Sequence, residues 1–301
     1  MREAPQSLEC LQPANAILGE SPSWDAAAGV LYWIDGKHPA LFRWQEGIGQ
    51  SGHWPMPQPV GCVASARSGQ VVFADAAGLG LLELQSGEIS RINRRELSQC
   101  SNQLNDGKVD RAGRFWVGSM DVKEKEAVGC LYRLDPDFSI HCVDRGFICS
   151  NGLGWSPDNH TMYFTDSVIR TIFAYEYDLT SGAQGARRVF ATLDDGDGLP
   201  DGLTVDSEGF VWSAIWDGWR LIRYAPDGSI DQEVRLPVQR PTSCSFGGLD
   251  LKTLFITSAS DGLSALQLQQ GPLAGALFAL HTDVAGLPET PFAGGRSCRN
   301  P

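Results

Sequence analysis

Short runs of mostly apolar residues, bounded by Gly, Pro or Asp, recur along the chain at nearly even spacing. Continuous runs of this kind, rich in aromatic and β-branched residues, are typical of buried β-strands. Six of them can be aligned: GVLYWID (29–35), GQVVFAD (69–75), GRFWVGSM (113–120), HTMYFTDS (160–167), GFVWSAIW (209–216) and KTLFITSA (252–259). Their starts lie 40, 44, 47, 49 and 43 residues apart. A strand-and-turn repeat of this length is typical of a β-propeller blade.

Each repeat predicts several strands. A small-residue segment precedes every run, starting near residues 19, 61, 105, 151, 201 and 244, and an aromatic-aliphatic segment follows every run. Fourth strands are predicted to start near residues 89, 140, 187 and 231. Residues 7–13 are expected to supply the outer strand of the last blade and so close the ring. We therefore expect one all-β domain spanning 1–301, a six-bladed β-propeller with four antiparallel strands per blade and about 24 strands.

Composition and charge narrow the function classes. The chain has 34 Gly and 17 Pro and no long amphipathic helical pattern, which agrees with an all-β fold. Its net charge of −12 argues against a nucleic-acid partner. No apolar stretch reaches the length of a membrane span, and the first residues lack the apolar core of a signal peptide. The eight cysteines form no CxxC pair, so reduced thiols and a cytoplasmic location are expected.

Common catalytic motifs are missing from the sequence. It contains no GxSxG, no P-loop, no GxGxxG and no HExxH, and its five histidines are scattered. The acidic segment 194–198 lacks the pattern of an EF-hand, so we interpret it as a solvated loop between blades rather than a calcium loop.

Polar oxygen ligands begin four of the six predicted inner strands. They are Glu20, Asn105, Asn151 and Asp201, whereas Gly61 and Cys244 take the equivalent places in the other two repeats. A single Asn-Gly or Asp-Gly pair is typical of a turn. Four such oxygens at equivalent positions instead indicate a ring of donors around the channel. Carboxylate and amide oxygens from separate blades suit a divalent cation.

At these residues the chain resembles the regucalcin/gluconolactonase (SMP-30) family, which includes bacterial sugar lactonases. The similar segments are LGESPSWD (18–25), NDGKVDRAGRFWVGSM (105–120), SNGLGWSPD (150–158), PDGLTVDSEGFVW (200–212) and SCSFGG (243–248). The resemblance implies a six-bladed propeller with one divalent metal in its channel. It places the metal ligands on Glu20, Asn151 and Asp201, a general base on Asp201, and a substrate-binding role on Asn105.

Two positions depart from that family. Gln103 stands where many members carry a substrate-binding Arg, two positions before the Asn-Asp-Gly. Lys123 stands where vertebrate members carry a substrate-contacting Glu, and Glu124 follows it. The metal ligands are thus intact, while the residues associated with substrate choice differ.

The expected function is metal-dependent hydrolysis of a sugar-acid lactone, such as xylono-, arabinono- or gluconolactone, to the aldonic acid. A bound cation would polarise the lactone carbonyl, Asp201 would accept a proton from the attacking water, and Asn105 and Gln103 would bind hydroxyl groups. Trp216 and Trp219 are candidates for stacking on the sugar, although core packing is the commoner role of such residues. Ca²⁺ is favoured, with Zn²⁺, Mg²⁺, Mn²⁺ or Fe²⁺ as alternatives. The alternative functions are a non-catalytic calcium-binding regulatory protein and a propeller scaffold for protein partners.

Overall fold

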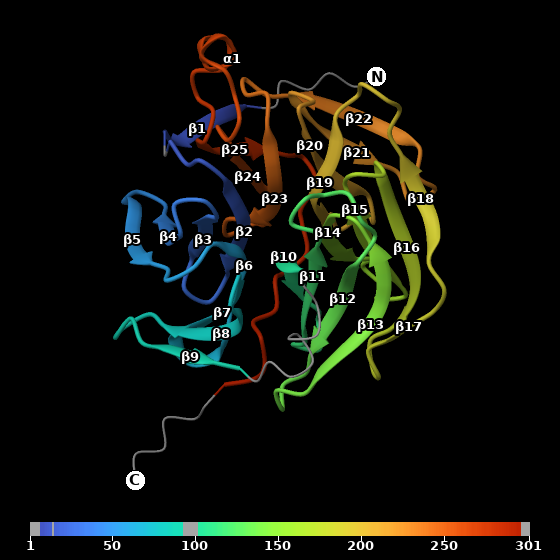
Figure 1. Ribbon diagram of the computed structural model, residues 1–301. Coiled ribbons are helices and arrows are strands. Elements are labelled where there is room, and N and C mark those ends of the chain that lie inside the picture. Colours follow the sequence, from blue (N-terminus) through green and yellow to red (C-terminus); the bar gives the residue numbers. More distant parts are fainter. Residues whose placement is uncertain (1–6, 14, 93–101, 296–301) are drawn as a thin grey trace.

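Six antiparallel sheets surround one central axis in the computed structural model, which describes residues 7–13, 15–92 and 102–295 (Figure 1). Blade 1 contains β2 (Gly19–Asp25), β3 (Val30–Asp35), β4 (Ala40–Gln45) and β5 (Gly49–Pro55); blade 2 contains β6 (Val60–Ser65), β7 (Gln70–Asp75), β8 (Gly78–Glu83) and β9 (Ile89–Arg91); blade 3 contains β10 (Gln103–Val109), β11 (Phe115–Met120), β12 (Gly129–Leu134) and β13 (Ile140–Phe147). Blade 4 contains β14 (Ser150–Trp155), β15 (Thr161–Asp166), β16 (Thr171–Asp178), β17 (Ala183–Gln184) and β18 (Arg188–Thr192); blade 5 contains β19 (Leu199–Val205), β20 (Val211–Trp216), β21 (Arg220–Tyr224) and β22 (Ile230–Arg235); blade 6 contains β23 (Pro241–Gly247), β24 (Thr253–Ser258), β25 (Leu277–His281) and β1 (Leu8–Gln12).

The predicted six-bladed β-propeller is confirmed. The inner strands β2, β6, β10, β14, β19 and β23 begin within three residues of the predicted positions and pack on one another around the axis. The N-terminal strand β1 pairs antiparallel with β25, with Leu8 opposite Leu280, so the two ends of the chain share one blade as expected. Blade 4 has an additional short strand because both β17 and β18 pair with β16.

The aligned apolar runs form the second strand of every blade. These strands, β3, β7, β11, β15, β20 and β24, are almost wholly buried because each blade is covered on both faces by its neighbours. Trp116 of blade 3 thus meets Trp155 of blade 4 edge to face, and Trp212 of blade 5 meets Phe246 of blade 6 in the same way. Burial on two faces explains why the runs are continuous rather than alternating.

Helical structure is scarce in the described residues. A 3₁₀ turn, η1 (Arg67–Gly69), lies in blade 2, and one short helix, α1 (Ala265–Gln270), lies between β24 and β25. Ser264 caps α1, since its side chain accepts a hydrogen bond from the backbone of Gln267. No helix within the described ranges is both long and apolar enough to cross a membrane.

The segment after β25 crosses one end of the ring. The backbone oxygen of Ala285 accepts a hydrogen bond from Ser207 N at 2.9 Å. Phe292 N donates to Ser65 O at 2.8 Å, and Ala293 N donates to Gly113 O at 2.9 Å. Ser65 ends β6, Ser207 follows β19, and Gly113 lies in the turn between β10 and β11. This segment, residues 282–293, therefore lies at the end of the channel opposite the starts of the inner strands. It ties blades 2, 3 and 5 together at that end.

The structure also describes most of the cysteines and the acidic segment 194–198. Cys62, Cys130, Cys149 and Cys244 are buried free thiols, as expected for small apolar side chains, whereas Cys100 and Cys298 lie outside the described residues. The acidic loop 194–198 is exposed: Asp195 is 93% exposed and pairs with Arg170 at 2.6 Å. The loop interpretation of this segment therefore fits the structure.

Candidate metal and substrate site

Every inner strand carries a β-bulge close to its start. The irregularity in pairing with the second strand falls between Glu20 and Ser23, Val60 and Cys62, Leu104 and Gly107, Asn151 and Leu153, Pro200 and Leu203, and Pro241 and Cys244. A bulge bends a strand locally and re-aims its side chains. The four predicted oxygen donors therefore stand at or inside the bulge of their strand, which is where the equivalent repeat positions lie.

The glycines after the candidate ligands serve close packing rather than turns. A Cβ atom on Gly152 would lie 2.5 Å from the carbonyl oxygen of Asp201, and one on Gly202 would lie 2.1 Å from the hydroxyl of Ser243. Both glycines lie within inner strands, β14 and β19. The turn interpretation of Asn-Gly and Asp-Gly is therefore wrong at these two positions: glycine is needed because neighbouring blades approach closely at the level of the ligands.

Hydrogen bonds link Asn105 of blade 3 to Asn151 of blade 4. The Asn105 Nδ2 atom donates to the Asn151 Oδ1 atom at 3.2 Å and to the backbone oxygen of Ser150 at 2.9 Å. Asn151 is 7% exposed, and its own Nδ2 donates to the hydroxyl of Ser167 at 2.9 Å. The oxygen of Asn151 is thus turned toward Asn105, and the amide nitrogen of Asn151 is turned away from it.

Three carboxylates from three blades influence one another in the channel. Burial, followed by the charges of Asp201 and Asp106, raises the pKa of Glu20 well above its usual range. Burial and the charge of Asp106 likewise raise the pKa of Asp201. Burial raises the pKa of Asp106 to about 6, although the Gly107 amide and Lys108 oppose this shift. Such mutual repulsion is the environment that a bound cation relieves.

The donor set fits a hard divalent cation. Asp201 is 5% exposed, and its Oδ1 atom is buried without a hydrogen-bond partner in the structure. A buried oxygen of this kind is costly unless something else satisfies it. Within the described ranges, no three His, Cys, Asp or Glu side chains gather closely enough to hold a metal by themselves. A cation held by the predicted residues would therefore need the amide oxygen of Asn151 as well as Glu20 and Asp201.

The two departures from the family pattern occupy different surroundings. Gln103, the first residue of β10, pairs with Met120 and is half-buried, two positions before Asn105. Glu124 lies in an exposed loop, at a φ of 53°, and its charge contributes to the raised pKa of Asp201. The family resemblance singled out Lys123 at this loop. In the structure it is the neighbouring Glu124 whose charge acts on the candidate ligand Asp201.

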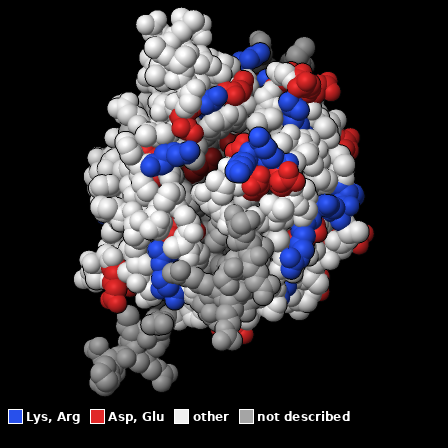
Figure 2. Space-filling model, in the orientation of Figure 1, with Lys and Arg blue, Asp and Glu red and all other residues white. Residues whose placement is uncertain are grey.

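The tryptophans Trp216 and Trp219 are partly exposed and do not belong to the buried core. The guanidinium of Arg240 lies 4.5 Å from the centre of the Trp216 ring and is paired with Asp217 at 2.7 Å. Arg240 directly precedes β23, which places this group at the end of the channel where the inner strands start. Figure 2 shows one face of the molecule, where a hollow containing acidic side chains lies beside basic ones.

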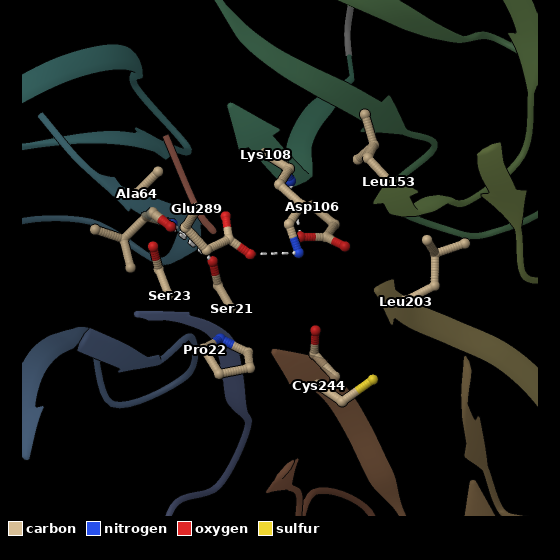
Figure 3. Close-up of a pocket in the computed structure, with 13 residues that line it drawn as sticks. Ser21, Pro22, Ser23, Ala64, Asp106, Lys108, Leu153, Leu203, Cys244 and Glu289 are labelled. Carbon is tan, nitrogen blue, oxygen red and sulfur yellow. Dashed lines mark hydrogen bonds and ion pairs between the residues drawn. The ribbon is translucent and has the colours of Figure 1, made fainter. Parts of the chain in front are cut away.

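A cavity of about 20 Å³, lined by both polar and apolar side chains, lies deeper in the channel. Asp106, Lys108 and Glu289 line it together with Ser21, Ser23 and Ser243 (Figure 3). Glu289 belongs to the C-terminal segment 282–293 and pairs with Lys108 at 2.9 Å. The cavity has room for about one water molecule, and the charged and hydroxyl groups on its wall offer that molecule hydrogen-bond partners.

Comparison with known proteins agrees with this geometry. A family model described as SMP-30/Gluconolactonase/LRE-like region matches residues 18–260. The chain belongs to this family. The predicted resemblance is therefore confirmed, and the matched residues include Glu20, Asn105, Asn151 and Asp201.

Members of this family resemble the chain over almost its whole length. The regucalcin of Gallus gallus is 37% identical over 294 residues, which cover 95% of this chain and 98% of that protein. A 6-deoxy-6-sulfogluconolactonase of Pseudomonas putida is 34% identical over 290 residues, which cover 96% and 99%. The solved structure of a calcium-binding protein, regucalcin, from Agrobacterium tumefaciens is 25% identical with a TM-score of 0.90, and the match covers 95% and 97%.

Sequence reasoning left several residues of this region without a role. Asp106 follows Asn105 directly, yet its burial beside two other carboxylates appears only in the fold. Ser167, at the end of the aligned run 160–167, contacts Asn151 although sixteen positions separate them. The only signal for Ser167 in the sequence is its place just after the strand that pairs with β14.

Proposed function

We propose that this chain hydrolyses the lactone of a sugar acid to the open-chain aldonic acid, using a divalent cation bound by Glu20, Asn151 and Asp201. The observation that carries the proposal is the buried Oδ1 atom of Asp201, which has no hydrogen-bond partner. Two further carboxylates, those of Glu20 and Asp106, interact with Asp201 through their charges. Membership of a family that includes a sulfogluconolactonase supports lactone hydrolysis as the reaction. Ca²⁺ is the preferred cation because all three donors are oxygens.

The chain's own residues have separable tasks in this reaction. A cation bound there supplies Lewis-acid polarisation of the lactone carbonyl. Asp201 is also the candidate general base, because a carboxylate beside the cation can accept a proton from the attacking water. Both N–H groups of Asn105 are engaged with Ser150 and Asn151, which leaves its oxygen to accept a hydrogen bond from a substrate hydroxyl. Gln103 offers a second hydroxyl contact from the same strand.

The proposed substrate is a neutral lactone, with a pentonolactone ahead of gluconolactone. Two basic side chains at the end of the channel where the inner strands start are already paired with carboxylates. Arg240 pairs with Asp217 at 2.7 Å, and Lys37 pairs with Asp261 at 3.6 Å. Gln103 offers uncharged hydrogen-bonding groups at the position where many family members carry a positively charged Arg. A substrate with an anionic group would have to compete for Arg240 and Lys37, whereas neutral hydroxyl groups bind to amide side chains directly.

The test is hydrolysis of a lactone panel by chelator-treated protein restored with Ca²⁺, Mg²⁺, Mn²⁺, Fe²⁺ or Zn²⁺ in turn. We expect no activity without cation and the highest kcat/KM on xylono- or arabinonolactone. Preference for a phosphorylated lactone or an aryl ester would contradict the substrate class. Cation binding without turnover on any lactone would instead favour a regulatory calcium-binding protein.

A further inference from the structure

We infer that Ser167 is a positioning residue of the proposed cation site, whose hydroxyl fixes the side-chain amide of Asn151 with its oxygen toward the cation. The inference rests on the proposed ligand set and adds a residue to which no role has been given. Ser167 is 5% exposed and follows β15 in blade 4.

The hydrogen bonds of Ser167 have only one consistent direction. Its Oγ atom lies 2.7 Å from the carbonyl oxygen of Pro200, to which only the hydroxyl can donate. With its single proton used there, Oγ meets Asn151 as an acceptor, at 2.9 Å from Nδ2. The nitrogen end of the Asn151 amide must therefore face Ser167.

The other neighbours of Asn151 enforce the same orientation. Its Nδ2 atom also lies 3.8 Å from the Sγ atom of Cys149, a weak acceptor, while its Oδ1 atom accepts from Asn105 Nδ2 at 3.2 Å. Rotating the amide by half a turn would set oxygen against the Ser167 oxygen and nitrogen against the Asn105 nitrogen. Ser167 is thus the strongest acceptor among the contacts that keep the oxygen of Asn151 available as a ligand.

Ser167 also links two of the proposed ligands across a blade boundary. Pro200 directly precedes Asp201 in β19, whereas Asn151 belongs to β14 of the neighbouring blade. The backbone of Ser167 is itself fixed, since its N–H donates to Cys149 O at 3.0 Å and its carbonyl accepts from Arg170 N at 2.9 Å. One buried hydroxyl therefore sets both the orientation of Asn151 and its position relative to the strand of Asp201.

The test measures cation affinity directly, by calorimetric titration of Ca²⁺ or Mn²⁺ into chelator-treated protein. Ser167→Ala is expected to lose about 10- to 100-fold in affinity, the range typical for removing a residue that orients a ligand. Ser167→Thr keeps the hydroxyl and is expected to stay within about threefold of the parent. Ser258→Ala is the matched control, because Ser258 also donates to a carbonyl (Ala276 O, 2.7 Å) and accepts from a backbone N–H (Gly275, 3.1 Å), and neither partner is a proposed ligand.

A second background separates orientation from stability. In Asn151→Asp the two side-chain oxygens are equivalent, so no amide orientation remains to be fixed. Adding Ser167→Ala there is expected to change affinity much less than it does beside Asn151, and this double-mutant cycle stays informative even when Ser167→Ala lowers Tm. Equal losses in both backgrounds, or a Ser167→Ala variant that binds like the parent, would overturn the inference alone. A parent protein that binds none of the cations would overturn the proposed function, and the inference with it.

Discussion

The side chain of Asn105 donates a hydrogen bond to the side-chain oxygen of Asn151 at 3.2 Å, across the boundary between blades 3 and 4. A proposed substrate-binding residue therefore supports a proposed metal ligand. The same amide nitrogen also donates to Ser150 O at 2.9 Å, so its orientation is fixed before any substrate binds. In the proposed site, substrate contact and cation binding would thus be coupled through one amide group.

Replacing Asn105 tests this coupling. We expect Asn105→Ala to raise KM about tenfold, since it removes one substrate hydrogen bond worth on the order of 1.5 kcal/mol. A smaller fall in cation affinity should accompany it, because Asn151 keeps its contact with Ser167. Steady-state kinetics at saturating cation and calorimetric titration measure the two effects. Asn159→Gly, in a turn at the other end of blade 4, is the control, and an unchanged KM in Asn105→Ala would contradict the substrate role.

Asp201→Asn should change activity and stability in opposite directions. Loss of a ligand and a general base is expected to lower kcat by about 10²–10⁴-fold. The cation-free variant should nevertheless melt at a higher temperature, because a buried carboxylate with a raised pKa is replaced by a neutral amide of the same shape. Asp106→Asn is the comparison: it should gain stability in the same way and keep cation binding. Full activity in Asp201→Asn would show that both roles assigned to Asp201 are wrong.

The ring of blades could be predicted because its signal is repeated and strongly apolar. Strands β3, β7 and β11 are buried on both faces, so each appears in the sequence as a continuous run. Strand β5 (Gly49–Pro55) gave no such signal, since it is an outer strand whose residues are partly exposed and include Gly, Gln, Ser and His. The C-terminal segment was also missed, because backbone hydrogen bonds hold it and it has no regular pattern.

The candidate site could be predicted only as far as the repeat register reaches. Equivalent repeat positions identified the four oxygen donors Glu20, Asn105, Asn151 and Asp201, and only the family resemblance selected three of them as metal ligands. In the structure these donors stand at or inside the bulges of their strands. The roles themselves stay predictions. What sequence could not show is which neighbours fix each side chain. Ser167 and Asn151 lie sixteen residues apart, and only the pairing of β14 with β15 brings them together.

The stability of the cation-free protein should depend on Asp106 in a pH-dependent way. Its pKa is raised from 3.8 to about 6 by burial, so the folded chain binds a proton more tightly there than the unfolded chain does. The contribution of Asp106 to the free energy of unfolding therefore falls as pH rises from about 4 to about 6, and the penalty stays in full above that. Asp106→Asn should raise Tm relative to the parent at pH 7 and make little difference at pH 4.

The control for this comparison is Asp195→Asn, because Asp195 is 93% exposed and should give no pH-dependent difference. Thermal unfolding of each variant and of the parent in chelator, at matched ionic strength, gives the measurement. A gain for Asp106→Asn that is equal at both pH values would show that burial of this carboxylate is not what costs stability.

The ion pair between Lys108 and Glu289 should stabilise the closed end of the channel. The two groups are 2.9 Å apart with side chains only 18% and 11% exposed, and Lys108 also opposes the rise that burial causes in the pKa of Asp106. Lys108→Met leaves two carboxylates in the channel without the ammonium group that faces them, and we expect it to lower the free energy of unfolding by about 3–5 kcal/mol.

Glu289→Gln should cost less, because Lys108 retains Asp106 nearby and Gln still accepts the hydrogen bond that Ser245 donates at 3.2 Å. The double variant Lys108→Met/Glu289→Gln should recover part of the loss, since it removes one of the two unpaired charges. Urea unfolding of the four proteins gives the coupling free energy, and strictly additive losses would mean that the C-terminal segment is held by its backbone hydrogen bonds and not by this pair.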